Sequence, residues 1–192
     1  MATTANGNGA SGYRPRLMDK YQSEVAGALK EKFGYKNVMQ IPRLVKVTVN
    51  MGVGEASRDI KEMDSATKEL TAITGQKPRL NRAKISVSQF KIREGMPVGC
   101  SVTMRGHRMY DFLDRFVNTA VPRIRDFRGL PGNSFDGRGN YSVGIREHSI
   151  FVELDPNEIP HNRGLDVTVV TTAKTDAEAK ELLRLLGFAF RN

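Results

Sequence analysis

The segment of residues 75–84 carries the side chains best suited to binding chemistry. It places four cations, Lys77, Arg79, Arg82 and Lys84, within eight residues and contains no acid. No packed core needs such a segment, so we expect it to extend as an arm toward a polyanion, most often the phosphate backbone of a nucleic acid. Phosphate contacts of this kind give affinity and strong salt dependence without sequence information.

Side chains for catalysis or metal binding lack the necessary spacing. His107, His148 and His161 have no Cys or His partner three or four residues away, so we expect them at a helix entry, on the surface or in packing. Cys100 alternates with apolar residues, which predicts a small buried side chain. The sequence Gly-Val-Gly at 52–54 lacks the third glycine of a dinucleotide loop and the Gly-Lys pair of a phosphate loop.

The remaining candidates for acid and base chemistry are two carboxylate pairs. Glu153 lies near Asp155, and Asp111 lies near Asp114, but such pairs are common on solvated faces. We therefore expect no enzyme, no cofactor and no metal site. An RNA-processing enzyme whose catalytic groups lie far apart in the sequence stays open as an alternative.

The positive charge is concentrated in the middle of the chain. Of a formal net charge of +9, most comes from residues 76–128, which hold 12 lysines and arginines against 4 acids. The isoelectric point of about 9.8 exceeds the value of roughly 9 that is typical of nucleic-acid-binding domains. Two alternatives stay open, a basic surface kept for solubility and a generic binder of polyanions or membrane surfaces.

Length and composition predict a soluble protein with one main domain. The 192 residues, 39% of them hydrophobic, suffice for one core over residues 13–192, and residues 1–12 form an uncharged polar segment that we expect to be a flexible tail. A single cysteine excludes an internal disulfide and suits a reducing compartment. No apolar run reaches the roughly 18 residues of a membrane span, so we expect a cytoplasmic location without membrane contact.

Hydrophobic periodicity predicts four helices. Helical spacing runs over residues 16–33 and 60–74, each followed by a glycine, and over residues 109–117. The last helix begins at a capping box, Thr175 with Glu178, and ends before Gly187.

Strict alternation predicts the strands. Residues 44–49 should place Val45, Val47 and Val49 on the buried face. Residues 89–93 and 98–104 should form a hairpin, and two further strands are expected at residues 141–146 and 165–170. Residues 122–140 contain several glycines, prolines and arginines without a period, which predicts a long loop that is either functional or disordered.

These elements predict an α+β fold in two layers, with a largely antiparallel sheet, helices packed on one face and long basic loops. The other face of the sheet would then be open to a ligand. We expect it to carry cations and hydrogen-bonding side chains, namely Lys46, Thr48, Gln89, Lys91, Arg93, Ser101, Thr103, Arg105 and Thr168, with Tyr35, Asn37 and Gln40 at its edge. Such a face could recognise the shape and 2′-hydroxyls of a folded RNA.

Six blocks of the sequence, in the same order, resemble a known family, the bacterial-type large-subunit ribosomal protein five, which binds 5S rRNA. They are LVKVTVNMGVG (44–54), LTAITGQKP (70–78), RAK (82–84), FKIREGMPVG (90–99), VTMRG (102–106) and RIRDFRGL (123–130). The resemblance covers roughly residues 13–190. It departs from the family pattern at Arg79 and Asn81, where an aliphatic residue and a small hydroxyl residue are more usual.

The resemblance implies a structural component of the central protuberance of the large ribosomal subunit that holds 5S rRNA against the large-subunit rRNA. It also implies a contact with the elbow of peptidyl-site tRNA and a bridge to a protein of the small-subunit head. Together with the open face, it gives the expected rRNA-binding residues as Tyr35, Asn37, Gln40, Lys46, Thr48, Asn50, Met51, Gly52, Gln89, Lys91, Arg93, Met96, Pro97, Gly99 and Thr103. The expected tRNA-binding residues are Gln76, Lys77, Pro78, Arg79, Asn81, Arg82, Ala83 and Lys84.

Two expectations test the separation of arm and sheet. Replacing all four arm cations by alanine should leave 5S rRNA binding intact. Without RNA, residues 75–86 and 128–140 should be poorly ordered, because their cations lack partners and their backbones lack a hydrogen-bonded ladder.

Overall fold

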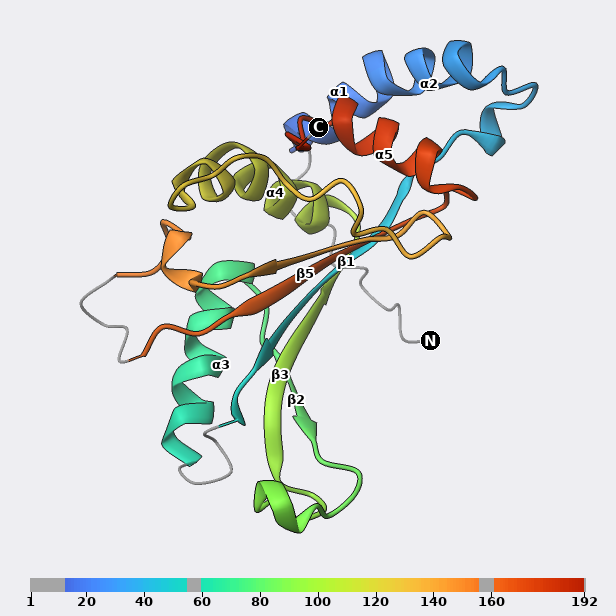
Figure 1. Cartoon of the computed structure of the whole chain (residues 1–192). Coiled ribbons are helices and arrows are strands. Elements are labelled where there is room, and N and C mark those ends of the chain that lie inside the picture. Colours follow the sequence, from blue (N-terminus) through green and yellow to red (C-terminus); the bar gives the residue numbers. More distant parts are fainter. Residues whose placement is uncertain (1–12, 55–59, 156–160, 192) are drawn as a thin grey trace, which may run out of the picture.

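A five-stranded antiparallel sheet runs through the length of the molecule (Figure 1). The computed structural model describes residues 13–54, 60–155 and 161–191. The strand order is β2-β3-β1-β5-β4, and every neighbouring pair is antiparallel. The strands are β1 (Leu44–Gly52), β2 (Arg79–Arg82), β3 (Pro97–Met104), β4 (Tyr141–Ile145) and β5 (Leu165–Thr171).

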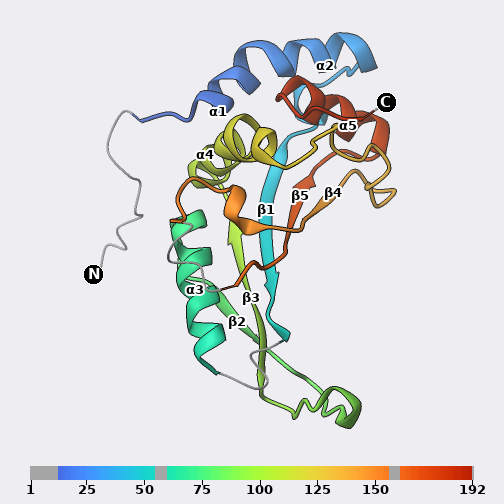
Figure 2. The ribbon, with the colours of Figure 1, turned by 60° about the vertical axis from the view of Figure 1, so that its left-hand side comes forward.

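Helices pack on one side of this sheet, which confirms the predicted α+β fold. Figures 1 and 2 show α3 and α4 on the same side, and no described helix covers the other side of the central strands in either view. Within the N-terminal helical segment, α1 contacts α4 and α2 contacts α5. The α-helices are α1 (Arg16–Lys20), α2 (Ala26–Phe33), α3 (Ile60–Thr74), α4 (His107–Arg115) and α5 (Asp176–Leu185), with π-helical turns at Tyr21–Val25 and Phe116–Ala120 that continue α1 and α4.

The helix ends follow the predicted local signals. Gly34 and Gly75 both adopt a φ of 65°, the left-handed conformation that terminates a helix and that glycine adopts without strain. At the start of α5, the Thr175 side chain accepts a hydrogen bond from the Glu178 backbone, and the Glu178 carboxylate accepts one from the Thr175 backbone. This is the predicted capping box.

Strand β1 corrects one prediction. Val47 and Val49 are fully buried as expected, but Val45 is 40% exposed and Leu44 is buried in its place. The pairing with β5 shifts between Leu44 and Lys46, which indicates a β-bulge. Because a one-residue shift reverses the face of every side chain beyond it, the alternation of valines alone could not place Val45.

The predicted hairpin is wrong in its first strand. β3 pairs with β2, and the segment expected to pair with it instead forms a 3-10 turn, Ser88–Phe90, followed by Lys91 with a φ of 55°. Residues 83–96 form the projecting end of the β2–β3 hairpin (green, at the bottom of Figure 1). An edge strand tolerates charged residues, so the basic composition of β2 concealed it.

The buried core contains residues from Leu17 to Phe188. Phe112, Phe116 and Phe151 stack with ring centroids 6.0 to 6.4 Å apart. Cys100 is fully buried, and this burial raises its pKa to about 11, so the thiol is inert packing as predicted. The division into a tail over residues 1–12 and one domain over residues 13–192 stays a prediction, because the tail lies outside the described residues.

The long loop before β4 is tied to the C-terminal part of the chain. Leu130 pairs in parallel with Phe190, its N–H donating to the carbonyl oxygen of Ala189 over 2.7 Å. The Asp176 carboxylate accepts hydrogen bonds from the backbones of Gly137 and Gly139. The expectation that residues 75–86 and 128–140 lack backbone hydrogen-bond partners is wrong for both segments, because β2 and this loop have such partners.

Candidate RNA interface

The face of the sheet opposite the helices carries short polar side chains from neighbouring strands. Thr48 on β1 lies opposite Thr103 on β3 and Thr168 on β5, and all three are partly exposed. Directly paired residues of antiparallel strands share a face, so the hydroxyls form a row across the sheet. We call this surface the open face; its polar members are Lys46, Thr48, Asn50, Arg79, Asn81, Ser101, Thr103, Ser142, Asp166 and Thr168.

A few hydrogen bonds hold these side chains in place. The Asn81 amide nitrogen lies 3.2 Å from the Ser101 hydroxyl and 3.5 Å from Asn50 Oδ1, and the Ser142 and Thr168 hydroxyls are 3.1 Å apart. Each hydroxyl and amide has more hydrogen-bonding groups than these contacts use. The open face therefore offers donors and acceptors to a ligand.

The central predictions for the open face are confirmed in position, with Lys46, Thr48, Thr103 and Thr168 all on it. Ser101 also lies there. Arg105 follows β3 directly and is exposed.

Sequence reasoning missed two members of the open face. Ser142 alternates with buried Tyr141 and Val143, so the pattern of β4 contained the signal. Asp166 lies opposite Asn50, and its carboxylate limits where a phosphate can approach.

The end of the open face lacks side chains. Gly52 pairs with Gly99, and a Cβ on Gly99 would lie 2.8 Å from the carbonyl oxygen of Met51. Glycine is therefore required at position 99. Gly52 is exposed, and its bare backbone allows close approach of a ligand, whereas Gly99, an expected contact residue, is buried. The Met51 side chain is fully buried, so this expected contact residue belongs to the core. Pro97, the first residue of β3, is partly exposed.

A short turn lies at the opposite end of the molecule from the hairpin tip (Figure 1). Asn37 caps the 3-10 helix Val38–Gln40, its Oδ1 accepting a 2.9 Å hydrogen bond from the Met39 N–H. Burial raises the pKa of Tyr35, which packs against Phe33 and stays neutral. Gln40 is exposed, and so are two apolar side chains that the sequence did not single out, Val38 at 65% and Met39 at 81%.

The basic arm and the sheet form one continuous surface. Arg79 lies opposite Ser101 and therefore on the open face, so the arm is partly an edge strand. The Arg82 guanidinium donates to the carbonyl oxygen of Gly95 over 2.9 Å. Lys77 and Lys84 are exposed at the two ends of β2. The other expected arm residues are less accessible, with Gln76 and Ala83 partly exposed and Pro78 buried.

Three cationic or polar residues predicted on the sheet lie instead on the hairpin tip. Gln89, Lys91 and Arg93 are exposed there, because residues 88–93 turn back on themselves. The bridge between Val87 and Ile92 closes this turn. Partly exposed Met96 lies at its base; its sulfur accepts a hydrogen bond from the Arg93 N–H. The tip thus extends the basic surface beyond the open face.

The cations of this surface are free to bind an external anion. The ion pairs in the described part of the chain involve other residues, such as Arg16 with Asp114 and Lys32 with Glu181. No carboxylate of the described chain pairs with the cations of the arm, open face or tip, which are Lys46, Lys77, Arg79, Arg82, Lys84, Lys91, Arg93 and Arg105. This charge is therefore available to phosphates.

A separate cluster of buried charged side chains joins α3 to other parts of the chain. Arg163 donates to both carboxylate oxygens of Glu69, at 2.7 and 2.6 Å, and to Glu62. The ring of His148 lies 3.1 Å from Glu69 and accepts from the Arg163 backbone at Nδ1. These partners lie up to 101 residues apart in the sequence, so no local motif announces them. The cluster fixes α3 to the segments before β5 and after β4.

Other carboxylates and histidines outside the interface also have structural partners or positions. Asp111 accepts a 2.7 Å hydrogen bond from Tyr13, and Glu153 pairs with Arg115. His161 lies 3.7 Å from Glu62, and His107 begins α4. Within the residues described, no group of three His, Cys, Asp or Glu side chains could hold a metal ion, and no helix is long and apolar enough to cross a bilayer.

Comparison with known proteins assigns most of the chain to one ribosomal protein family. Residues 37–93 match the family described as ribosomal protein L5, and residues 97–190 match the model of the C-terminus of the same ribosomal family. The large ribosomal subunit protein uL5 of Kocuria rhizophila is 61% identical over 93% of this chain and 95% of its own. Those of Thermobifida fusca and Streptomyces griseus are 56% and 58% identical, each over 92% of this chain and over 93% and 96% of their own length. This chain belongs to the ribosomal protein L5 family.

Proposed function

We propose that this protein binds 5S rRNA through the open face and the 35–40 turn, and holds it against the large-subunit rRNA in the central protuberance. Membership of the L5 family makes it a structural constituent of the large ribosomal subunit, on the ribosome in the cytoplasm. L5 proteins are structural components rather than enzymes. The observation that carries the proposal is a row of hydroxyls and amides across the sheet, bordered by cations that have no carboxylate partner among the described residues.

The two kinds of group have different tasks in this proposal. Cations on the arm and tip contact phosphates, which supplies affinity but no selectivity. The hydroxyls of Thr48, Thr103 and Thr168 recognise 2′-hydroxyls and base edges across a wide, shallow groove. The exposed bare backbone at Gly52 lets the RNA approach closely at one end of the face.

The same proposal assigns the outer parts of the basic surface to other partners. Lys77 precedes β2, and Lys84 follows it at the start of the projecting end of the hairpin; both contact the elbow of peptidyl-site tRNA. The protein also contacts a protein of the small-subunit head and so forms a bridge between the two subunits. Both contacts rest on family membership, supported by the exposure and free charge of these residues.

A valine series tests the role of the hydroxyls. Thr48→Val, Thr103→Val and Thr168→Val keep the branched shape that suits a strand but remove the hydroxyl. At about 1 kcal/mol for each hydrogen bond, the triple variant should bind 5S rRNA about a hundredfold more weakly. The control is Thr67→Val, Thr71→Val and Thr119→Val on the helical side, which should bind normally.

An arm variant tests the separation of partners. Because Arg79 lies on the open face and Arg82 binds its own loop, the four-residue alanine variant is now expected to weaken 5S rRNA binding in part. Lys77→Ala with Lys84→Ala removes only the flanking cations and should leave 5S rRNA affinity within a fewfold of normal. Equal affinity of the native protein for heparin, DNA and 5S rRNA at matched salt would instead support a generic polyanion binder.

A further inference from the structure

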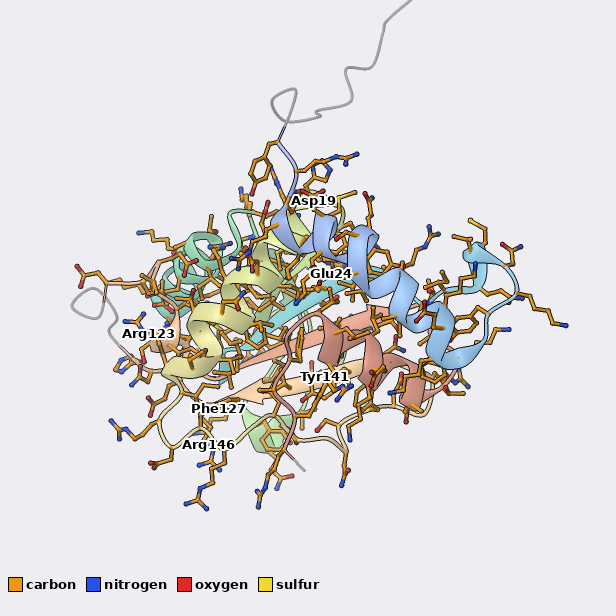
Figure 3. All side chains as sticks on the ribbon, turned by 90° about the horizontal axis from the view of Figure 1, so that it is seen from above. Asp19, Glu24, Arg123, Phe127, Tyr141 and Arg146 are labelled. Carbon is orange, nitrogen blue, oxygen red and sulfur yellow. The ribbon has the colours of Figure 1, made fainter. Side chains whose placement is uncertain are left out.

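A cavity of about 490 Å³ opens at the β4 edge of the sheet, at the far side from the basic arm. One wall is formed by residues 124–126 and the other by residues 144–147, with Ile150 between them. Figure 3 shows Phe127, next to the first wall, and Arg146 at the same edge of the molecule. Neither wall belongs to the surface described above for 5S rRNA.

Each wall of this cavity presents an arginine followed by an acid. Arg125 precedes Asp126, and Arg146 precedes Glu147. None of these four side chains makes a hydrogen bond or ion pair with the residues that the structure describes. The floor is apolar, because Ile145 and Ile150 line the cavity as part of the core.

The edge of β4 adds unused backbone groups. The Ser142 N–H donates to the Ser134 carbonyl oxygen over 3.1 Å, away from β5. Ser142 and Thr168 therefore form a non-hydrogen-bonded pair, and two residues further along so do Gly144 and Asp166. The N–H and C=O of Gly144 consequently point outward at the edge that lines the cavity.

We propose that this cavity holds one guanine base extruded from a single-stranded segment of RNA. Guanine has two acceptors, O6 and N7, on one edge, which a guanidinium binds with two hydrogen bonds. Its Watson–Crick edge has two adjacent donors, at N1 and N2, which a carboxylate accepts. Its ring stacks on an arginine plane or on the isoleucine floor. The other three bases lack this combination of edges.

The inference rests on the proposed RNA binding and adds a base-specific contact to it. The alternative ligand for this site is an extended peptide that pairs with the edge of β4. The observations favour a base, because Ser134 already occupies the edge at Ser142 and leaves only a short free stretch at Gly144. Charges of both signs also suit the mixed edges of a base better than a peptide of one charge.

Titration of the full-length ¹⁵N-labelled protein with short RNA tests the proposal. The probes are the pentamers UUGUU, UUAUU, UUCUU and UUUUU at low salt. UUGUU should shift the amide signals of Gly144 and Arg146 and bind about tenfold more tightly than the other three. Arg146→Ala and Glu147→Gln should each weaken UUGUU binding by about tenfold, the usual size of one stacking or bidentate contact.

Arg138→Ala is the matched control, because Arg138 is an exposed arginine outside the cavity. It should not change the preference for guanine. The Glu147→Gln result is the most discriminating, since removing an acid strengthens any binding that depends on charge alone.

Shifts spread over the arm with no preference among the pentamers would overturn the proposal. So would a stronger shift of the same amides by an extended peptide such as acetyl-Glu-Val-Thr-Val-Glu-amide. The 5S rRNA affinity of each variant separates this inference from the proposed function. If 5S rRNA binds normally while UUGUU does not select the cavity, only the guanine site fails; if 5S rRNA does not bind, the proposed function fails.

Discussion

Glu69→Gln should destabilise the protein and remove much of its acid sensitivity. Glu69 is 7% exposed, and burial by itself opposes its ionisation. Hydrogen bonds from His148, Arg163 and Ser65 outweigh that burial and lower the pKa of Glu69 from 4.5 to about 2. The carboxylate is therefore strongly favoured in its charged form in the folded state.

The size of the effect follows from this pKa difference. A shift from 4.5 to about 2 corresponds to about 3 kcal/mol of folding free energy. Because the folded pKa is the lower one, this stability is fully present above pH 4.5 and is lost as the pH falls toward 2. Breaking a buried ion pair by removing one partner costs roughly 3–5 kcal/mol, which agrees in magnitude.

Urea unfolding at pH 7, 5, 4 and 3 measures both consequences. At pH 7, Glu69→Gln should lower the free energy of unfolding by about 3 kcal/mol. Between pH 5 and pH 3 it should lose less stability than the native protein, because position 69 no longer titrates. Glu94→Gln is the matched control: Glu94 lies exposed on the hairpin tip, and its loss should cost less than about 0.5 kcal/mol.

Equal stability of Glu69→Gln and the native protein at pH 7, together with parallel pH profiles, would refute this reasoning. It would mean that the cluster contributes no net stability. Arg163→Met provides a second check, because it leaves Glu69 buried without its main cation and should cost at least as much as Glu69→Gln at pH 7.

Three further outcomes are expected. Gly139→Ala should lower the free energy of unfolding, measured in urea, by about 1–3 kcal/mol, because Gly139 has a φ of 77° and a Cβ there would lie 2.9 Å from Ala173. The control is Gly137→Ala. Gly137 has a φ of 80° but open space around it, so this substitution should cost less stability. Thr175→Ala removes the capping box and should cost about 1 kcal/mol, measured as a lower melting temperature. In hydrogen exchange of the free protein, hydrogen-bonded amides of β2 should be more protected than those of Ile85, Ser86 and Ser88 on the hairpin tip, and equal rapid exchange would contradict the observed ladder.

Local signals in the sequence predicted the elements whose cause is local. Gly34 and Gly75 end helices because each adopts a left-handed conformation, and the Thr175 capping box starts α5. The threonines of the open face were also predictable, since alternation places Thr48 and Thr103 opposite buried apolar neighbours.

Features that depend on pairing over long distances could not be read in this way. Residues 89–93 alternate like a strand, yet β2 takes their place beside β3, because a charged edge strand has no distinctive pattern. A bulge moves Val45 to the surface. The Glu69, Arg163 and His148 cluster joins segments distant in the sequence, so only the fold reveals it.

Methyl NMR of the protein labelled at threonine, isoleucine, leucine and valine, during titration with 5S rRNA, tests the central claim most directly; Leu80, Ile85, Val87 and Ile92 report on the arm and hairpin tip. If the open face binds the RNA, the methyl signals of Thr48, Thr103 and Thr168 shift at stoichiometric RNA and keep most of that shift as salt rises to the point where binding begins to fail. Shifts confined to residues of the arm and hairpin tip, with these three threonines unchanged, would show that the protein binds 5S rRNA by charge alone and would contradict the account.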